Sequence, residues 1–199
     1  MKRIIISLAM TMMLASPNAQ TNETQHIKEQ LLSQYDYDEK TLNVLAEKLL
    51  RGEQLDCMKE EYSDMEPNYA SFRDGEYHAL YIYPDGSAAV LSVTGGTIAQ
   101  GTYSSGGNWY TWNNALVSGG NGIVRMQFQA TFSGSQYDAT ISSVSNGYVY
   151  LSGNKDGTLS IINGHVTSGS ASAMLSYSSY SLTLNVPVGN NNPTAILSY

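Results

Sequence analysis

The sequence predicts a mainly β protein: an antiparallel β-sandwich, or an irregular barrel, of about ten short strands with an N-terminal helical hairpin. Only extended backbone explains the two-residue alternation over residues 124–132, because successive side chains of a strand point to opposite faces. The apolar side chains of this segment occupy the even positions: Val124, Met126, Phe128, Ala130 and Phe132. From Tyr69 onward, Tyr, Ser, Gly, Asn and Thr dominate, and turn residues separate short apolar runs. Strands with one apolar side predict an antiparallel sheet with one buried face.

Residues 1–19 have the features of a secretory signal peptide. Lys2 and Arg3 precede an apolar run over residues 4–14, and small residues follow up to Ala19. The run is shorter than the roughly 20 residues that a membrane-spanning helix needs. Pro17 lies close to the predicted cleavage after Ala19 and fits that site poorly, so the sequence does not fix the exact cleavage position. We therefore expect a secreted protein, extracellular or associated with the cell surface, with no membrane insertion after cleavage.

Charge is concentrated in the front part of the chain. Residues 20–86 contain six Lys or Arg and fifteen Asp or Glu. The charged residues of the following segment, 87–199, are only Arg125, Asp138, Lys155 and Asp156. Nucleic acids and anionic membrane surfaces are bound through clustered cations. The sequence therefore argues against nucleic acid as a partner.

Residues 20–66 predict an acidic helical hairpin. Thr24 is the expected N-cap of the first helix and Asp38 that of the second, which should end just before Gly52. Residues 55–62 add one more helical turn before Pro67. The apolar positions of the two helices recur at helical spacing: Ile27, Leu31, Leu32, Tyr35, Leu42, Leu45, Leu49 and Leu50. We expect this hairpin to cover an edge or an open face of the sheet.

Residues 67–199 predict the β domain. Its candidate strands cover residues 77–83, 88–94, 97–103, 109–117, 124–132, 137–144, 148–152, 158–162, 171–177, 180–188 and 195–199. Pro187 cannot donate a ladder hydrogen bond, so we expect it at an edge or at a strand end. The Gly-containing turns recur at irregular spacing, which argues against a solenoid or a propeller.

Short turn motifs predict how the strands are connected. Tyr83–Ser87 reads Tyr-Pro-Asp-Gly-Ser, which suits a tight hairpin corner. Asn146-Gly147, Asp156-Gly157 and Asn163-Gly164 each suit the positive φ angles of a type I′ hairpin turn. These dipeptides predict a meander of short antiparallel strands.

Two motifs carry a resemblance to a known group of proteins. Leu49–Asp56 reads Leu-Leu-Arg-Gly-Glu-Gln-Leu-Asp, and the Tyr-Pro-Asp-Gly-Ser turn follows. With these motifs, residues 38–94 resemble uncharacterised small secreted proteins of Gram-positive bacteria, in which a leucine-rich helix, a Gly-Glu-x-Leu-Asp exit and a Tyr-Pro-Asp-Gly-Ser hairpin precede a β domain. The resemblance implies export and this order of domains, and it implies no catalytic or binding residue.

An aromatic segment is the best candidate for a binding site. In a strand, Trp109 faces one side and Tyr110 and Trp112 face the other, so both sides carry aromatic area. Rings flanked by the amides of Asn113 and Asn114 suit stacking on sugar rings or on a protein partner. The alternative is that these rings are core residues.

Two further features of the β domain bear on partners. From Ser87 onward, the content of Tyr, Ser, Gly and Asn is typical of antibody paratopes, and it is also common in exported β proteins for structural reasons. Only Arg125, Lys155 and Pro187 are available to protect sheet edges, so chains could pair through their edges. Coverage of the edges by the helical hairpin is the alternative.

Catalytic chemistry has little support in the sequence. His26, His78 and His165 have no nucleophile motif and no metal-ligand spacing around them. Short acidic pairs occur at residues 36/38, 60/61 and 74/76, as expected for a solvated acidic segment. Asn154–Gly157 has part of a calcium-loop pattern but lacks the other oxygen ligands. The sequence indicates no metal and no cofactor.

Cys57 is the only cysteine, so no disulfide can form within the chain. A lone exported thiol can pair between chains or act as a nucleophile, and no accompanying motif supports the second role. A structurally tolerated residue is the simpler interpretation.

The sequence thus favours a non-enzymatic binding module for a glycan or a protein partner. A self-associating structural protein of the cell surface or matrix is the first alternative. A secreted hydrolase or toxin without a recognisable motif is the second.

Overall fold

The computed structural model describes residues 17–33, 35–73, 76–102, 108–151, 153–189 and 192–198. Most of the predicted signal peptide lies outside these residues, and its last three residues belong to the first helix. In the described part of the chain, no helix has both the length and the apolar character needed to cross a bilayer.

The front part of the chain is helical, as predicted. It contains α1 (Pro17–Leu32), α2 (Glu39–Leu50) and two short 3₁₀ turns, η1 (Asp56–Met58) and η2 (Glu60–Tyr62). The Asp38 cap of α2 is confirmed, because its carboxylate accepts hydrogen bonds from the Thr41 N–H at 3.0 Å and the Thr41 hydroxyl at 2.6 Å. Gly52 follows the helix with a φ of +72°, the left-handed conformation that suits a glycine at this position. The predicted cap at Thr24 is wrong, since Thr24 lies within α1.

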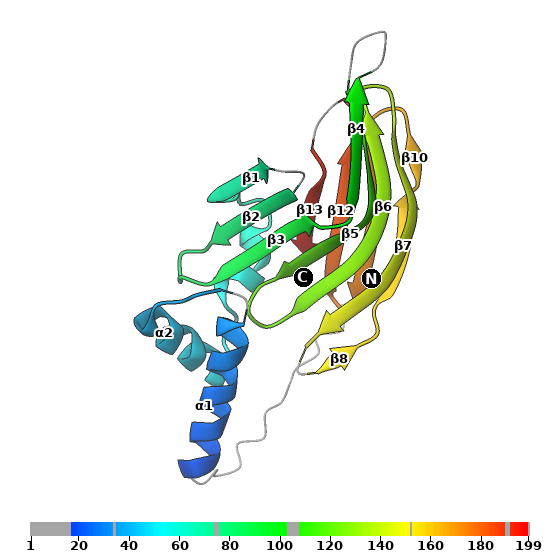
Figure 1. The fold of residues 1–199 in the computed structure, drawn as a ribbon. Helices are drawn as coiled ribbons and strands as arrows, with labels where there is room; N and C mark the ends of the chain where they lie inside the picture. The colour runs from blue at the N-terminus through cyan, green and yellow to red at the C-terminus, as the bar shows by residue number, and fades with distance from the viewer. Residues whose placement is uncertain are drawn as a thin grey trace.

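Antiparallel strands form two sheets that pack face to face, so the sandwich prediction is confirmed (Figure 1). Among the described residues, the larger sheet has nine strands, in the order β1-β2-β3-β5-β6-β7-β10, with β4 beside β5 and β8 beside β7. These strands are β1 (Tyr69–Arg73), β2 (Glu76–Ile82), β3 (Ala88–Thr94), β4 (Thr97–Thr102), β5 (Asn108–Gly120), β6 (Arg125–Ser135), β7 (Ala139–Tyr150), β8 (Asn154–Lys155) and β10 (His165–Val166). The smaller sheet, in the order β13-β12-β11-β9, has four: β9 (Thr158–Asn163), β11 (Ser170–Tyr177), β12 (Tyr180–Pro187) and β13 (Thr194–Ser198).

The core lies between the two sheets. The even side chains of β6 from Met126 to Phe132 are buried, and they face buried side chains of the smaller sheet. The latter are Ala171, Ala173, Leu175, Leu182, Leu184 and Val186. Each large apolar side chain buried in this way contributes about 1.5–3 kcal/mol. A register slip of one residue would lose this term, which fixes the pairing of β6.

The predicted turn at Asn146-Gly147 is wrong, because β7 runs through both residues. Asn146 has a φ of +53°, and the pairing with β6 shifts register between Gln127 and Gln129. A Cβ atom on Gly147 would lie 2.9 Å from Leu175 Cδ1 of the opposite sheet. The dipeptide therefore forms a bulge at a close approach of the two sheets.

The two later dipeptides do not form hairpin turns either. β8 and β10 pair with β7, whereas β9, which lies between them in the chain, pairs with β11. The chain therefore changes sheet at Asp156-Gly157 and again at Asn163-Gly164, and neither glycine has a positive φ. Strand β1 was not predicted, and Pro187 ends β12 as expected.

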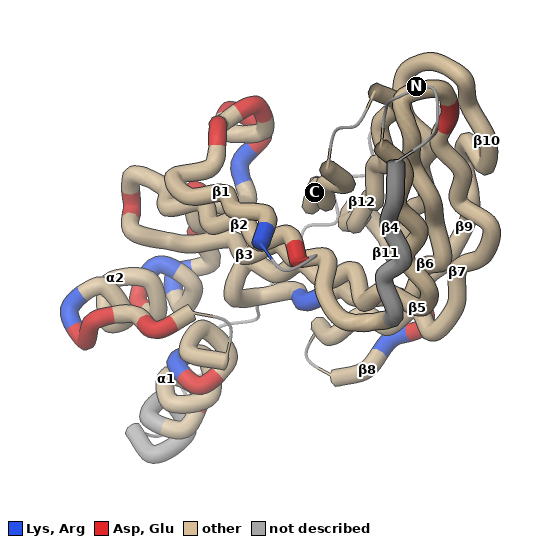
Figure 2. Tube along the Cα trace, turned by 45° about the horizontal axis from the view of Figure 1, so that its top comes forward, with Lys and Arg blue, Asp and Glu red and all other residues tan. Residues whose placement is uncertain are grey.

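The helical segment packs at the end of β2 and β3 (Figure 1). A second apolar core joins the helices to the β2–β3 turn and contains Leu31, Tyr37, Leu42, Leu45, Leu55, Cys57, Tyr83, Ala88 and Ala89. Figure 2 shows most charged positions on the helices and around β1 and β2, while β5, β6, β11 and β12 are almost free of charge. The charge asymmetry of the sequence is therefore an asymmetry in space.

Candidate functional site

Trp112 is a core residue. Its side chain is 1% exposed and stacks on Phe132, with ring centroids 5.3 Å apart and an interplanar angle of 27°. Tyr110 lies on the same face of β5, as predicted, and covers Gly134 of β6. Burial raises the pKa of Tyr110 to about 12. The prediction that Trp112 contacts a ligand is wrong, because its ring is buried in the core, stacked on Phe132 and with its centroid 6.2 Å from that of Phe72 of β1.

The other members of the predicted site lie apart from Trp112. Trp109 is half-buried on the outer face of β5, and Asn113 and Asn114 are exposed. The register with β6 shifts between Trp112 and Ala115, so the two asparagines occupy a bulge. Asn114 has a φ of +56°, and its N–H donates to Thr131 Oγ1 at 3.1 Å. The bulge explains the asparagines without a ligand.

A groove of about 300 Å³ lies on the inner face of the larger sheet, beyond the edge of the smaller one. Its floor is formed by Tyr81, Tyr83, Ala89 and Leu91, one wall by residues 60 and 62–67, and the other wall by residues 196–198 of β13. The groove exists because the larger sheet continues to β1 and β2, whereas the smaller sheet ends at β13. The η2 segment covers part of the remaining face, with Tyr62 and Tyr83 rings packed edge to face at 6.0 Å.

Strand β13 is an open edge along this groove. Among the described residues it pairs with β12 on one side only. Every second residue of an edge strand directs its N–H and C=O away from its partner. Residues 194–198 contain no Lys or Pro that would protect such an edge, and Ile196 is 47% exposed.

The opposite wall of the groove is acidic. Glu60, Asp64 and Glu66 line it and are exposed, and no ion pair involves them among the described residues. None of the described residues that line the groove is Lys or Arg. It therefore combines an apolar floor, an open strand edge and a negative rim. Residues 60–67 and 196–198 lie far apart in the sequence, and no local pattern links them.

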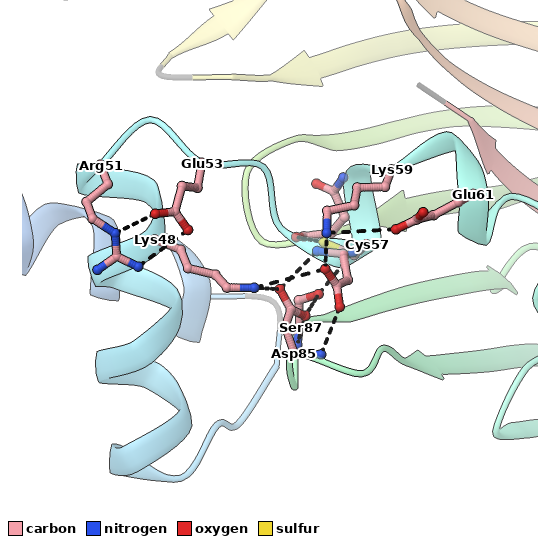
Figure 3. Close-up of polar contacts among 10 residues, drawn as sticks. Lys48, Arg51, Glu53, Cys57, Lys59, Glu61, Asp85 and Ser87 are labelled. Atoms are coloured by element: carbon pink, nitrogen blue, oxygen red, sulfur yellow. Dashed lines mark hydrogen bonds and ion pairs between the residues drawn. The ribbon is translucent and has the colours of Figure 1, made fainter.

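A second cluster of polar groups joins the helical segment to the sheet (Figure 3). Asp56 and Asp85 bond to each other's backbone N–H, at 2.9 and 3.0 Å. Lys48 pairs with Asp85 at 2.9 Å and Lys59 with Asp56 at 2.6 Å. Both carboxylates thus have cationic partners and lie at a junction between elements, so this arrangement is a structural clamp.

Cys57 belongs to this clamp. Its N–H donates to Ser87 Oγ at 3.0 Å, and its thiol lies 3.4 Å from the carbonyl oxygen of Asn121. Burial is the largest cause that raises the pKa of the thiol, to about 12. A thiol with this pKa is almost entirely protonated at neutral pH and is a poor nucleophile.

The three histidines and the acidic pairs at residues 36/38 and 60/61 are exposed, whereas Asp74 of the pair 74/76 lies outside the described residues. His78 lies 3.3 Å from Glu76, and His165 Nδ1 lies 2.8 Å from the Thr140 hydroxyl. In the described part of the chain, no three His, Cys, Asp or Glu side chains gather as a metal site. Residues 154–157 belong to β8 and the change of sheet that follows it.

The comparisons with known proteins give no relative for this chain: no protein-family model, no curated protein and no solved structure matches it.

Proposed function

We propose that this chain is an exported, non-enzymatic binding module that takes an extended segment of a partner protein along β13. The single observation that carries this proposal is the open edge of β13 beside an apolar groove. Strand addition uses such an edge, because main-chain hydrogen bonds supply affinity and alternate side chains enter pockets. Export rests on the sequence features of residues 1–19.

The rim of the groove defines the segment that fits. An apolar side chain of the partner would enter between Tyr81 and Leu91, and a Lys or Arg would face the carboxylates of Glu60, Asp64 and Glu66. Charge complementarity of this kind mainly increases specificity and the association rate. Pairing of β13 with a second copy of the chain would bring two such acidic rims together, which the like charges oppose.

A linear peptide library displayed on phage tests the proposal. Selection on the wild type should enrich sequences with alternating apolar residues and at least one Lys or Arg. A synthetic peptide from the selection should shift the backbone amide signals of residues 194–198 in NMR spectra of the ¹⁵N-labelled chain. Failure to enrich any sequence, or shifts confined to other strands, would contradict it.

Two triple variants with the same change of charge provide the control. Glu60→Gln, Asp64→Asn and Glu66→Gln together should weaken peptide binding several-fold and reduce its salt dependence, because each exposed charge pair contributes about 0.2–1 kcal/mol. Glu29→Gln, Glu39→Gln and Glu47→Gln on the helices should leave the affinity unchanged. Equal losses in both variants would mean that only net charge matters. Light scattering over a wide concentration range distinguishes peptide binding at β13 from self-association. Self-association would at least double the molar mass of the protein as its concentration rises.

A further inference from the structure

The outer face of the larger sheet carries two ordered rows of side chains. Successive registers align one residue from each of β1, β2, β3, β5, β6 and β7: Ser71, His78, Ser92, Ser118, Gln127 and Tyr148. The neighbouring row is Tyr69, Leu80, Val90, Gly120, Arg125 and Tyr150. Both rows belong to the face that points away from the smaller sheet, because the residues between them in sequence, such as Leu91 and Met126, are core residues.

Arg125 is the Lys or Arg residue of these two rows. It is exposed, and its guanidinium carbon lies 6.0 Å from the ring centroid of Tyr150. In the described part of the chain, no carboxylate forms an ion pair with it. Its planar guanidinium is suited to two parallel hydrogen bonds with a carboxylate or a sulfate group.

Shallow hollows flank Arg125 on both sides. One, of about 180 Å³, lies between Arg125, Tyr150 and the end of α1. The other, of about 170 Å³, lies between Arg125, Ser118 and Val90. Gly120 faces Val90 on one strand and Arg125 on the next, and it lines the second hollow.

The neighbours of Arg125 are aromatic or neutral polar groups. The rings of Tyr148 and Tyr150 are 44% and 37% exposed, with centroids 6.5 Å apart and planes inclined by 33°. Gln127 of β6 pairs with Tyr148, and Ser118 of β5 pairs with Gln127 on its other side. Hydroxyl and amide groups suit the hydroxyls of a sugar, and exposed aromatic rings suit the face of a pyranose.

We infer that this outer face binds an acidic oligosaccharide. Arg125 pairs with the carboxylate or sulfate group of one residue, Tyr148 and Tyr150 contact the sugar rings, and Ser118 and Gln127 bond to hydroxyls. One guanidinium beside neutral groups suits a single contact with a carboxylate or sulfate group, whereas a nucleic acid requires several phosphate contacts. The site lies on the opposite face of the sheet from the groove at β13, so it does not depend on the proposed peptide mode.

Calorimetric titration with three glycans tests the inference. The probes are oligomers of polygalacturonate, which carry carboxylates, chondroitin sulfate oligomers, which also carry sulfates, and neutral cello-oligosaccharides. Binding of either acidic glycan, with none or much weaker binding of the neutral one, is expected and identifies the anionic group. No heat with either acidic probe at millimolar concentration overturns the inference, as does equal affinity for the neutral one.

Variants assign the binding to the site. Arg125→Gln should lower the affinity at least tenfold, as the loss of a charge-assisted bidentate contact implies. Tyr148→Ala and Tyr150→Ala should each lower it several-fold, and circular dichroism should show that these surface variants remain folded. Lys40→Gln removes one exposed cation from α2 and should change nothing. An unaltered affinity in Arg125→Gln, or an equal loss in Lys40→Gln, overturns the inference. Peptide binding at β13 should be unchanged in all of these variants.

Discussion

Asp56 and Asp85 lie 29 residues apart and hold each other through reciprocal hydrogen bonds, each carboxylate accepting from the other's backbone N–H. Asp56 ends the Gly-Glu-x-Leu-Asp motif, and Asp85 is the third residue of the Tyr-Pro-Asp-Gly-Ser turn. The two motifs on which the resemblance depends are therefore two halves of one contact between the helical segment and β2–β3. This contact accounts for their residue types without a catalytic role.

Asp85→Asn should destabilise the protein at neutral pH by about 1–3 kcal/mol. Both oxygens of Asp85 accept bonds, one from Lys48 and Asp56 and the other from Ser87, so either orientation of an Asn amide places its NH₂ against donors. Urea unfolding at pH 7 measures this loss. The exposed Asp64→Asn is the control and should change the free energy of unfolding by less than about 0.5 kcal/mol. Equal effects of the two substitutions would contradict the clamp.

Acid should remove the contribution of the Asp85 carboxylate to stability. Burial alone would raise its pKa, but hydrogen bonds from Ser87, the Asp56 N–H and Lys48 outweigh burial and hold the pKa below the ordinary value of 3.8. A lowered folded-state pKa contributes stability above pH 3.8, and this contribution is lost as the pH falls through the folded-state value. Melting temperatures between pH 7 and pH 2.5 should therefore fall less steeply below pH 4 in Asp85→Asn than in the wild type. Parallel profiles would contradict the assignment.

Cys57 should be unreactive in the folded protein. A pKa of about 12 instead of 9.0 lowers the thiolate fraction at pH 8 about a thousandfold, and burial also blocks access. Labelling by a chromogenic disulfide reagent should therefore be slow in buffer and complete within minutes in 6 M guanidinium chloride. Rapid labelling of the native chain would instead support pairing between chains through Cys57.

Most of the fold could be predicted from alternation of side chains. The even positions of β6 and β12 carry the core, and a two-residue period cannot arise from a helix. The Asn-Gly and Asp-Gly dipeptides led to wrong predictions of hairpin turns, because a glycine is needed both at a tight turn and at a close approach between two sheets. At position 147 a glycine leaves room for the side chain of Leu175. These two residues lie on different sheets, so their contact cannot be predicted from the local sequence.

The candidate site was harder to predict than the fold. The aromatic segment suggested a binding surface, but which face of β5 is covered depends on the second sheet, and Trp112 lies on the covered side. The groove has walls from residues 60–67 and 196–198, so it exists only after the sheet topology is fixed. The rows through Arg125 likewise depend on registers across six strands.

Adjacent glycines between β3 and β4 should differ in their tolerance of alanine. Both have a positive φ, +68° at Gly95 and +75° at Gly96, so alanine at either position costs about 1–2 kcal/mol of backbone strain. A Cβ on Gly96 would also collide with the Asn113 carbonyl oxygen and lie 3.0 Å from the Ala115 nitrogen, whereas none of the described atoms lies within 4 Å of one on Gly95. Gly96→Ala should therefore cost about 1–3 kcal/mol more than Gly95→Ala in urea unfolding. Equal losses would mean that β5 moves aside freely.

The two tryptophans should separate into a core residue and a surface residue. Trp112→Ala removes a fully buried ring that stacks on Phe132, so it should lower the free energy of unfolding by about 3–5 kcal/mol. Trp109→Ala should cost about 1 kcal/mol, because its side chain is only partly buried. Fluorescence checks the same difference in milder variants: Trp109→Phe, which keeps only Trp112, should resist quenching by acrylamide, and Trp112→Phe should be quenched readily. Similar quenching in both variants would mean that Trp112 is accessible to solvent and that its face of β5 is available to a ligand.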